Sequence, residues 1–214
     1  MCSVQLVEWV DLVFGFAESG NYDSVLWLYE VSPSDPRNLT YLTETFENSS
    51  RLLHPYSDAV LDRAFWDLSH SAFRLVYEPG IEWELRHRFI RSFENLFRDL
   101  FASRCDPRFR GGHPEGSALN PSCYMWWDFD CWCAMPDPLT RNPYDSAFLD
   151  AMKAILALNH PSCQESALHG LGHWHWAHRS AVEAIIDDYL GDRRRQIPED
   201  LRRYALAARC GCVQ

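Results

Sequence analysis

The sequence predicts an all-α fold, and three observations lead to this expectation. Apolar residues recur three and four positions apart in nearly every regular stretch, as on one face of an α-helix. No convincing pair of strand patterns is present, although the short run Val25–Tyr29 fits a strand as well as a helix. With 214 residues, 47% of them hydrophobic and 23% charged, the chain is long enough for one sizeable core. We therefore expect a single helical domain over residues 1–214.

Residues 1–104 are expected to form the N-terminal helices. Ser57 is well placed to cap the fourth of them, which ends at Glu78-Pro79-Gly80. The fifth has the most continuous apolar face, with arginines on the opposite side. In order, the expected segments are Val4–Ala17, Ser24–Glu30, Asn38–Leu53, Ser57–Glu78 and Leu85–Phe101.

Residues 105–143 are expected to be a long irregular connection, rich in aromatic residues and proline. Six of the twelve prolines of the chain lie in it. An aromatic island interrupts it at Cys123–Phe129, where Ser122 is placed to cap a short helix. Connections of this length inside a compact domain are either functional or contain structure that the sequence pattern hides.

Residues 144–214 are expected to form the C-terminal helices. Asp145–Leu158 is the first, and Pro161 fits the first turn of the second. The run Ser180-Ala181-Val182-Glu183 has the pattern of a capping box that opens a third helix. Pro198 opens the last helix. Its apolar stripe is Leu201, Tyr204, Ala205 and Ala208.

These C-terminal helices resemble α-solenoid proteins of the HEAT-like kind. The resemblance is carried by ESALHGLGH (165–173), AVEAIIDDYL (181–190) and, after Pro198, LRRYALAA (201–208). It fits best over residues 145–212 and more loosely over 57–102. It implies antiparallel helix pairs packed side by side as a short solenoid-like domain, with a protein-binding surface. A fold of this kind implies no particular activity, because fold and function separate.

The same segment holds a dense group of possible metal ligands. Its histidines are His169, His173, His175 and His178. On a helix, Glu165, His169 and His173 lie one turn apart on one face, and such a stripe can present ligands to a divalent metal ion. The order differs from the His-Glu-x-x-His of zinc peptidases. We favour the simpler alternative, in which Glu165 pairs with His169 and both histidines pack against the next helix, with Gly170 and Gly172 allowing close approach.

The aromatic island supplies further candidate binding residues, namely Trp126, Trp127 and Asp128. Tryptophan is enriched at binding hot spots, and Asp128 and Asp130 alternate with aromatic residues. The pattern allows a peptide- or carbohydrate-binding platform, or acid–base chemistry by the two carboxylates. Packing of the island onto the rest of the domain is the simpler interpretation.

The eight cysteines are expected to be reduced and mostly buried. The N-terminal apolar segment contains Glu8 and Asp11 and does not have the pattern of an export signal, so we expect a cytoplasmic protein. Two Cys-x-Cys pairs, Cys131–Cys133 and Cys210–Cys212, lack the spacing of known zinc sites. Three other cysteines could supplement them: Cys105, Cys123 and Cys163.

Charge limits the class of partner. The net charge of −10 argues against general nucleic-acid binding. No apolar run reaches the length of a membrane-spanning helix. Residues 1–62 are mainly acidic and residues 86–110 mainly basic, which we expect to be used in contacts between helices. Arg193–Arg195 is expected to be a solvated turn.

We therefore expect a non-catalytic protein-binding or adaptor domain that acts around Trp126, Trp127 and His169. This interpretation needs no cofactor and assigns no metal ligand, and it leaves the partner and the oligomeric state open. The alternative is a metal-binding protein or metal-dependent enzyme that uses Glu165, His169 and His173 with an aspartate or cysteine from residues 123–133. A third possibility is a purely structural domain of a larger complex. Convergence of carboxylates or thiols from residues 105–143 on these imidazoles would favour the metal alternative.

Overall fold

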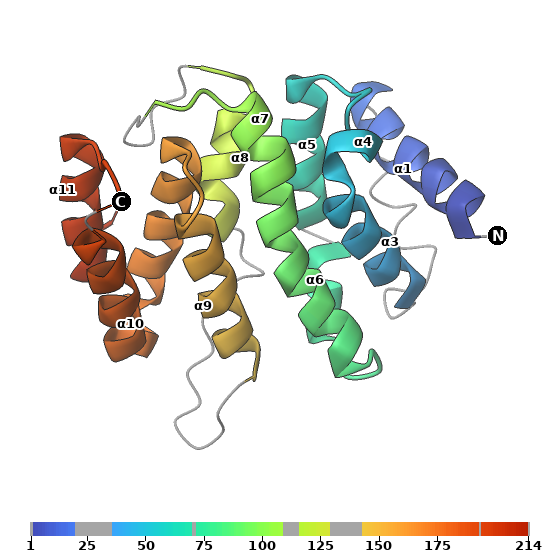
Figure 1. Cartoon of the computed structure of the whole chain (residues 1–214). Coiled ribbons are helices and arrows are strands. Elements are labelled where there is room, and N and C mark those ends of the chain that lie inside the picture. Colours follow the sequence, from blue (N-terminus) through green and yellow to red (C-terminus); the bar gives the residue numbers. More distant parts are fainter. Residues whose placement is uncertain are drawn as a thin grey trace.

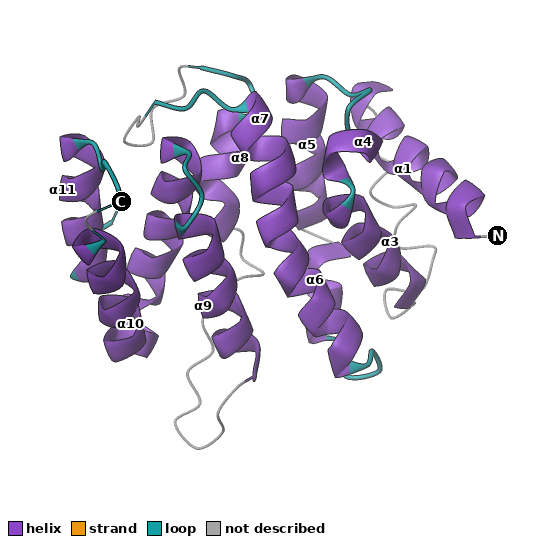
Figure 2. Ribbon diagram, in the orientation of Figure 1, coloured by secondary structure: helices purple, strands orange, loops and turns teal. Residues whose placement is uncertain are grey.

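The structure is a computed structural model that describes residues 2–19, 36–69, 72–108, 116–128, 143–192 and 194–213. Within these ranges every regular element is helical and no strand occurs, which confirms the all-α expectation (Figure 2). The helices follow one another across the molecule in chain order, from α1 at one end to α11 at the other (Figure 1).

The N-terminal helices agree with the expected segments except at two interruptions. The elements are α1 (Cys2–Ser19), α3 (Pro36–Glu47), α4 (Ser49–Leu52), α5 (Asp58–Ser69), the 3-10 helix η1 (Ala72–Tyr77), α6 (Trp83–Leu96), the π-helical turn η2 (Phe97–Phe101) and α7 (Ala102–Arg104). The expected helix at 38–53 is divided at Asn48, and the one from Ser57 ends at Ser69. Both side chains bond to the carbonyl groups of the preceding turn, Asn48 to Glu44 at 2.8 Å and Ser69 to Trp66 at 2.7 Å. Such bonds compete with regular helix. The segment Ser24–Glu30 lies outside the described residues.

The C-terminal elements begin inside the stretch that the sequence suggests is irregular. They are α8 (Asn120–Tyr124), the 3-10 helix η3 (Met125–Asp128), α9 (Pro143–Leu156), α10 (Pro161–Gly191) and α11 (Glu199–Arg209). The expected short helix in the aromatic island is therefore present. It begins at Asn120 and has Pro121 in its first turn, rather than a cap at Ser122.

The element α10 consists of two helical parts that fold back on each other, as the sequence predicts. Its backbone is non-helical at His178, with φ −130° and ψ 42°. The hydroxyl of Tyr189 donates to Gln164 Oε1 at 3.2 Å across a separation of 25 residues. A straight helix would place these residues about 37 Å apart. The break lies two residues before the expected cap at Ser180, where His178 contacts Asp145 at 2.6 Å and Glu183 pairs with Arg179 at 2.9 Å.

The centre of the core is an aromatic cluster built around Trp126. Six phenylalanine rings lie around its indole, with centroid distances between 5.3 and 5.9 Å. They are Phe46, Phe65, Phe73, Phe93, Phe97 and Phe101, and all are fully buried. These residues come from α3, α5, η1, α6 and η2, so one side chain of η3 joins most of the N-terminal helices.

The π-helical turn η2 explains how the continuous helical segment formed by α6 and η2 supplies three of these rings. Phe93, Phe97 and Phe101 are four residues apart, and in an α-helix such a repeat drifts by about 40° per turn. The wider turn at Phe97–Phe101 opposes that drift, so all three rings contact Trp126. Here the local deviation from α-helix serves the packing of the core.

Ion pairs between helices confirm the expected internal use of the uneven charge. Arg88 of α6 makes a bidentate contact with Glu47 of α3, at 2.8 and 2.6 Å. Arg104 of α7 pairs with Asp58 of α5 at 2.6 Å. In the described part of the chain, no helix is both long and apolar enough to cross a membrane.

Candidate metal centre

The turn η3 places its residues in two different environments. Trp126 enters the aromatic core, while Trp127 lies against α10. Asp128 ends the turn and meets the first part of α10 with its carboxylate 22% exposed. The aromatic residues of the island thus fix the position of the carboxylate that follows them.

The first part of α10 approaches η3 closely because residue 170 is a glycine. A Cβ atom built on Gly170 would lie 2.5 to 2.9 Å from side-chain atoms of Trp127. Any larger residue would push the helix and the indole apart. The neighbouring His169, and His173 one turn later, are thereby brought beside Asp128. Gly170 therefore allows a close approach, but to η3 and not to the next helix as expected from the sequence.

Three ligand atoms converge where η3 and α10 meet. His169 Nε2 lies 3.0 and 3.1 Å from the two carboxylate oxygens of Asp128. His173 Nε2 lies 2.9 Å from Asp128 Oδ1 and 3.1 Å from His169 Nε2. The three atoms therefore form a nearly equilateral triangle.

The size of this triangle suits a single transition-metal ion. Donor atoms about 2.1 Å from one ion and at right angles to one another lie about 3.0 Å apart. Two imidazoles and one carboxylate on one face of the coordination sphere form a recognised binding arrangement for such ions. We call Asp128, His169 and His173 the triad.

The triad is buried at one side and open at the other. The side chain of His169 is 1% exposed, whereas that of His173 is 43% exposed. A buried ligand is held rigidly, and an exposed one leaves a path for an ion from solvent. The arrangement therefore combines a fixed inner ligand with access from the His173 side.

Electrostatics keep the Asp128 carboxyl ionised. Burial raises its pKa, but hydrogen bonds from His169 and His173 lower it more, so the pKa lies well below its usual range. A carboxylate that is ionised across the physiological range is ready to bind a cation.

Two tyrosines hold the inner histidine. The hydroxyl of Tyr204, from α11, lies 2.7 Å from His169 Nδ1 and 3.2 Å from the hydroxyl of Tyr124. The ring of Tyr124, from α8, lies over His169 with a centroid distance of 4.4 Å. Burial raises the pKa of Tyr204 well above its usual range, and Tyr124 raises it further, so Tyr204 stays protonated.

The structure separates the candidate residues into core and site. Trp126 and Trp127 are 0% and 3% exposed, so their assignment as binding residues is corrected, because both indoles pack inside the domain. Asp128, His169 and His173 come together. Glu165 is buried one turn before His169 and is not among the three residues whose ligand atoms lie within 4.8 Å of one another. The nitrogens of His169 contact Asp128 and Tyr204, which corrects the expected pairing with Glu165.

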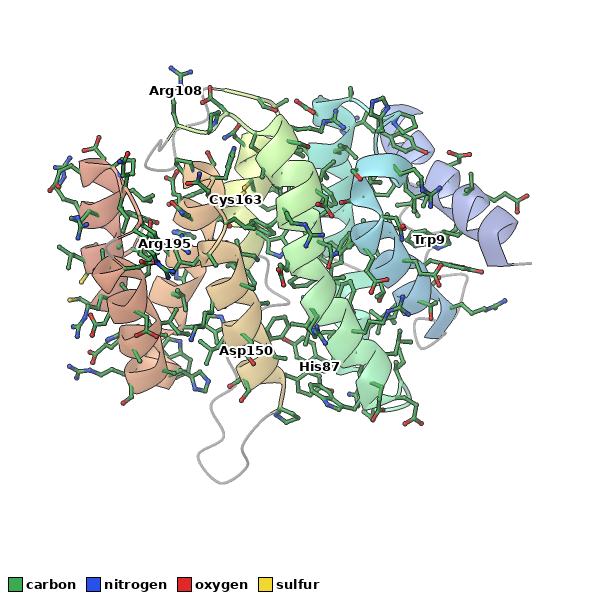
Figure 3. All side chains as sticks on the ribbon, viewed as in Figure 1. Trp9, His87, Arg108, Asp150, Cys163 and Arg195 are labelled. Atoms are coloured by element: carbon green, nitrogen blue, oxygen red, sulfur yellow. The ribbon has the colours of Figure 1, made fainter. Side chains whose placement is uncertain are left out.

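The remaining histidines and cysteines lie elsewhere. His175 Nε2 is 3.6 Å from Glu183, and His178 lies at the break in α10. Among the cysteines whose burial the structure describes, Cys105, Cys123 and Cys163 are buried, and Cys210 and Cys212 are exposed. Cys163 lies in the first turn of α10 (Figure 3), and its thiol donates to the carbonyl oxygen of Phe97 at 3.8 Å. Asp130, Cys131 and Cys133 lie outside the described residues.

The two tyrosines were missed as site residues. Tyr204 belongs to the apolar stripe of the last helix, and a tyrosine in a buried stripe needs a partner for its hydroxyl group. That requirement was the available signal.

Comparison with protein-family models, with curated proteins and with solved structures found no match.

Proposed function

We propose that this protein binds one divalent first-row transition-metal ion through Asp128, His169 and His173. The observation that carries the proposal is the convergence of one carboxylate oxygen and two imidazole nitrogens at 2.9 to 3.1 Å. In the sequence Asp128 lies 41 positions before His169, and His173 follows one helical turn later. Their meeting is therefore a property of the fold and not of a local motif.

A metal ion satisfies this arrangement better than hydrogen bonds alone. A neutral imidazole has one N–H donor, and the two Nε2 atoms lie only 3.1 Å apart beside the same carboxylate. If both carry hydrogen, the two hydrogens repel each other. An ion bound by the three donor atoms accepts a lone pair from both nitrogens and from the carboxylate at the same time.

The ligand set favours zinc or iron(II) over calcium or magnesium. Imidazole suits zinc, copper, iron and nickel, whereas calcium and magnesium prefer oxygen ligands. Three protein donors from the described residues match a catalytic centre, which keeps a position for water or substrate. We therefore propose a metal-dependent enzyme in preference to a purely structural metal site.

Metal binding by the purified protein tests the proposal. Protein stripped with a chelator is titrated with Zn²⁺, and anaerobically with Fe²⁺, against a chromophoric competitor, followed by elemental analysis. We expect one ion per chain in the wild type and its loss in His173→Ala, whose side chain is 43% exposed.

The matched control is His175→Ala, which removes an imidazole from the same helix outside the triad. Its Nε2 lies 3.6 Å from Glu183, so the variant should bind the ion as the wild type does. A wild type that binds neither ion, or a His175→Ala variant that loses as much affinity as His173→Ala, would contradict the proposal.

Protein binding is a second candidate, favoured by exposed apolar side chains on the last helices. Trp176 of α10 is 70% exposed and Leu206 of α11 is 51% exposed. On this proposal the two parts of α10 and α11 are HEAT-like pairs that present these side chains to a partner. Affinity capture with the wild type and with Trp176→Ser tests it. A partner recovered equally well by both proteins would count against this surface.

A further inference from the structure

We infer that Tyr204 is a positioning residue for the metal centre, which links metal binding to docking of the C-terminal helix α11. The inference rests on the proposed function. It adds a residue outside the triad and a form of regulation that the triad alone does not imply. Its starting point is the contact of 2.7 Å between the Tyr204 hydroxyl and His169 Nδ1.

The geometry of this contact is that of an in-plane hydrogen bond. The rings of His169 and Tyr204 are within 8° of parallel, and their centroids are 6.5 Å apart. At that distance the rings do not lie face to face, so the hydroxyl meets the edge of the imidazole. The ring of Tyr124 packs against the same imidazole, with a centroid distance of 4.4 Å and an angle of 38° between the ring planes. His169 is thus held by both tyrosines, with Nε2 directed toward Asp128.

Coordination through Nε2 requires the other nitrogen to carry the proton. A neutral imidazole has one N–H group, so a metal on Nε2 leaves the hydrogen on Nδ1. That hydrogen needs an acceptor, and the Tyr204 oxygen is the atom in reach. Partners of this kind fix the tautomer and orientation of metal-bound histidines.

The tyrosine pair can serve both states of the site. Without metal, His169 Nε2–H donates to Asp128 and the Tyr204 hydroxyl donates to Nδ1. With metal, Nδ1–H donates to the Tyr204 oxygen, and the Tyr204 hydroxyl donates to the Tyr124 oxygen 3.2 Å away. The proton lost from Nε2 is matched by the one gained at Nδ1, so His169 is neutral in both states.

The position of Tyr204 on α11 connects this exchange to the packing of that helix. α11 packs against α10 through side chains that are 0% exposed, namely Leu201, Ala205 and Ala208. If docked α11 strengthens metal binding, then bound metal strengthens docking of α11 by the same factor. On this inference, the affinity for the metal ion depends on whether α11 is docked against α10.

The test is Tyr204→Phe, which keeps the ring and removes the hydroxyl. Zn²⁺ affinity should fall by about 10- to 100-fold, as for other outer partners of metal-bound histidines. The matched control is Tyr189→Phe, which removes the hydroxyl that bonds to Gln164 on α10, away from the triad. Zn²⁺ affinity in that variant should equal that of the wild type.

Two further readouts separate positioning from general weakening of the fold. In the metal-free protein, the ¹⁵N shifts of His169 should show the Nε2–H tautomer in the wild type and a mixture of tautomers in Tyr204→Phe. Hydrogen exchange of the α11 amides should slow on Zn²⁺ binding in the wild type, and less so in Tyr204→Phe. Equal Zn²⁺ affinity in wild type and Tyr204→Phe overturns this inference alone. A wild type that binds no metal overturns the proposed function and this inference together.

Discussion

Trp126 and Asp128 are two residues apart on one 3-10 turn, yet they end in opposite environments. Trp126 lies among six phenylalanine rings at 5.3 to 5.9 Å, in contacts that are individually weak and have little direction. Asp128 faces two imidazoles at 2.9 to 3.1 Å, in contacts that are few and directional. The aromatic contacts of Trp126 fix the position of η3, and that position brings Asp128 beside the two imidazoles. Loss of the aromatic contacts should therefore damage both the fold and the site, and loss of the polar contacts mainly the site.

Trp126→Ala should have the largest effect. Removing this indole from a fully buried cluster should lower the free energy of unfolding by about 3–5 kcal/mol, and metal binding should fail with the fold. Urea unfolding and Zn²⁺ titration measure the two effects. Trp176→Ala, at a site that is 70% exposed, should change stability by less than about 0.5 kcal/mol. Similar losses of unfolding free energy in both variants would contradict the central position of Trp126 in the core.

Gly170→Ala tests whether the close contact between α10 and Trp127 of η3 sets the geometry of the site. The added Cβ would lie 2.5 Å from the ring of Trp127, so we expect a loss of about 1–3 kcal/mol and weaker Zn²⁺ binding, because Trp127 adjoins Asp128. Gly191→Ala is the control on the same element, since a Cβ there meets nothing within 4 Å. It should be neutral or slightly stabilising. Wild-type Zn²⁺ affinity in Gly170→Ala would show that the close approach does not set the site.

Asp128→Asn should act more on the site than on the fold. We expect loss of Zn²⁺ binding and a decrease in metal-free stability of about 1 kcal/mol at neutral pH. The folded pKa of Asp128 lies below the unfolded value of about 3.9, so this carboxylate stabilises the fold above that pH and the contribution is lost as the pH falls through the folded pKa. Acid unfolding of the variant should therefore start from a less stable protein and depend less steeply on pH. An unchanged acid profile would argue against the contacts to His169 and His173.

His173→Ala should have the smallest effect on the fold. Its side chain is 43% exposed, so metal-free stability should change by less than about 0.5 kcal/mol. The rise in melting temperature that Zn²⁺ produces in the wild type should nevertheless disappear. A retained rise in the variant would place the ion elsewhere.

Much of the fold could be predicted from the sequence because helical periodicity reports burial directly. The apolar face of residues 85–101 became α6 and η2, and the paired helices of α10 were separated correctly near Ser180. The interruptions at Asn48 and Ser69 depend on single side-chain bonds to the backbone, which compete with helix only once the local turn is formed.

The members of the site were among the candidates, and the metal alternative combined His169 and His173 with an aspartate or cysteine from residues 123–133. It also included Glu165, because spacing along one helix joins His173 to Glu165 as readily as to any distant residue. The partnership with Asp128 depends on η3 packing against α10, a contact between residues 41 positions apart. Trp126 and Trp127 are buried, as the simpler packing interpretation of the island predicted, and composition alone does not distinguish such a buried tryptophan from an exposed binding residue.

The contact between Trp127 and Gly170 also fixes where α10 stands along its own axis. A helix packed only through a smooth apolar face can slide by one turn, about 5.4 Å, and still cover the same neighbours. Here the indole of Trp127 occupies the space that the absence of a side chain at Gly170 leaves. The corresponding space at Gly172, on the opposite side of the helix, is filled by Val213. Movement of α10 along its axis in either direction would bring a side chain into contact with Trp127 or Val213. The axial position of the helix is therefore set by the absence of side chains at residues 170 and 172.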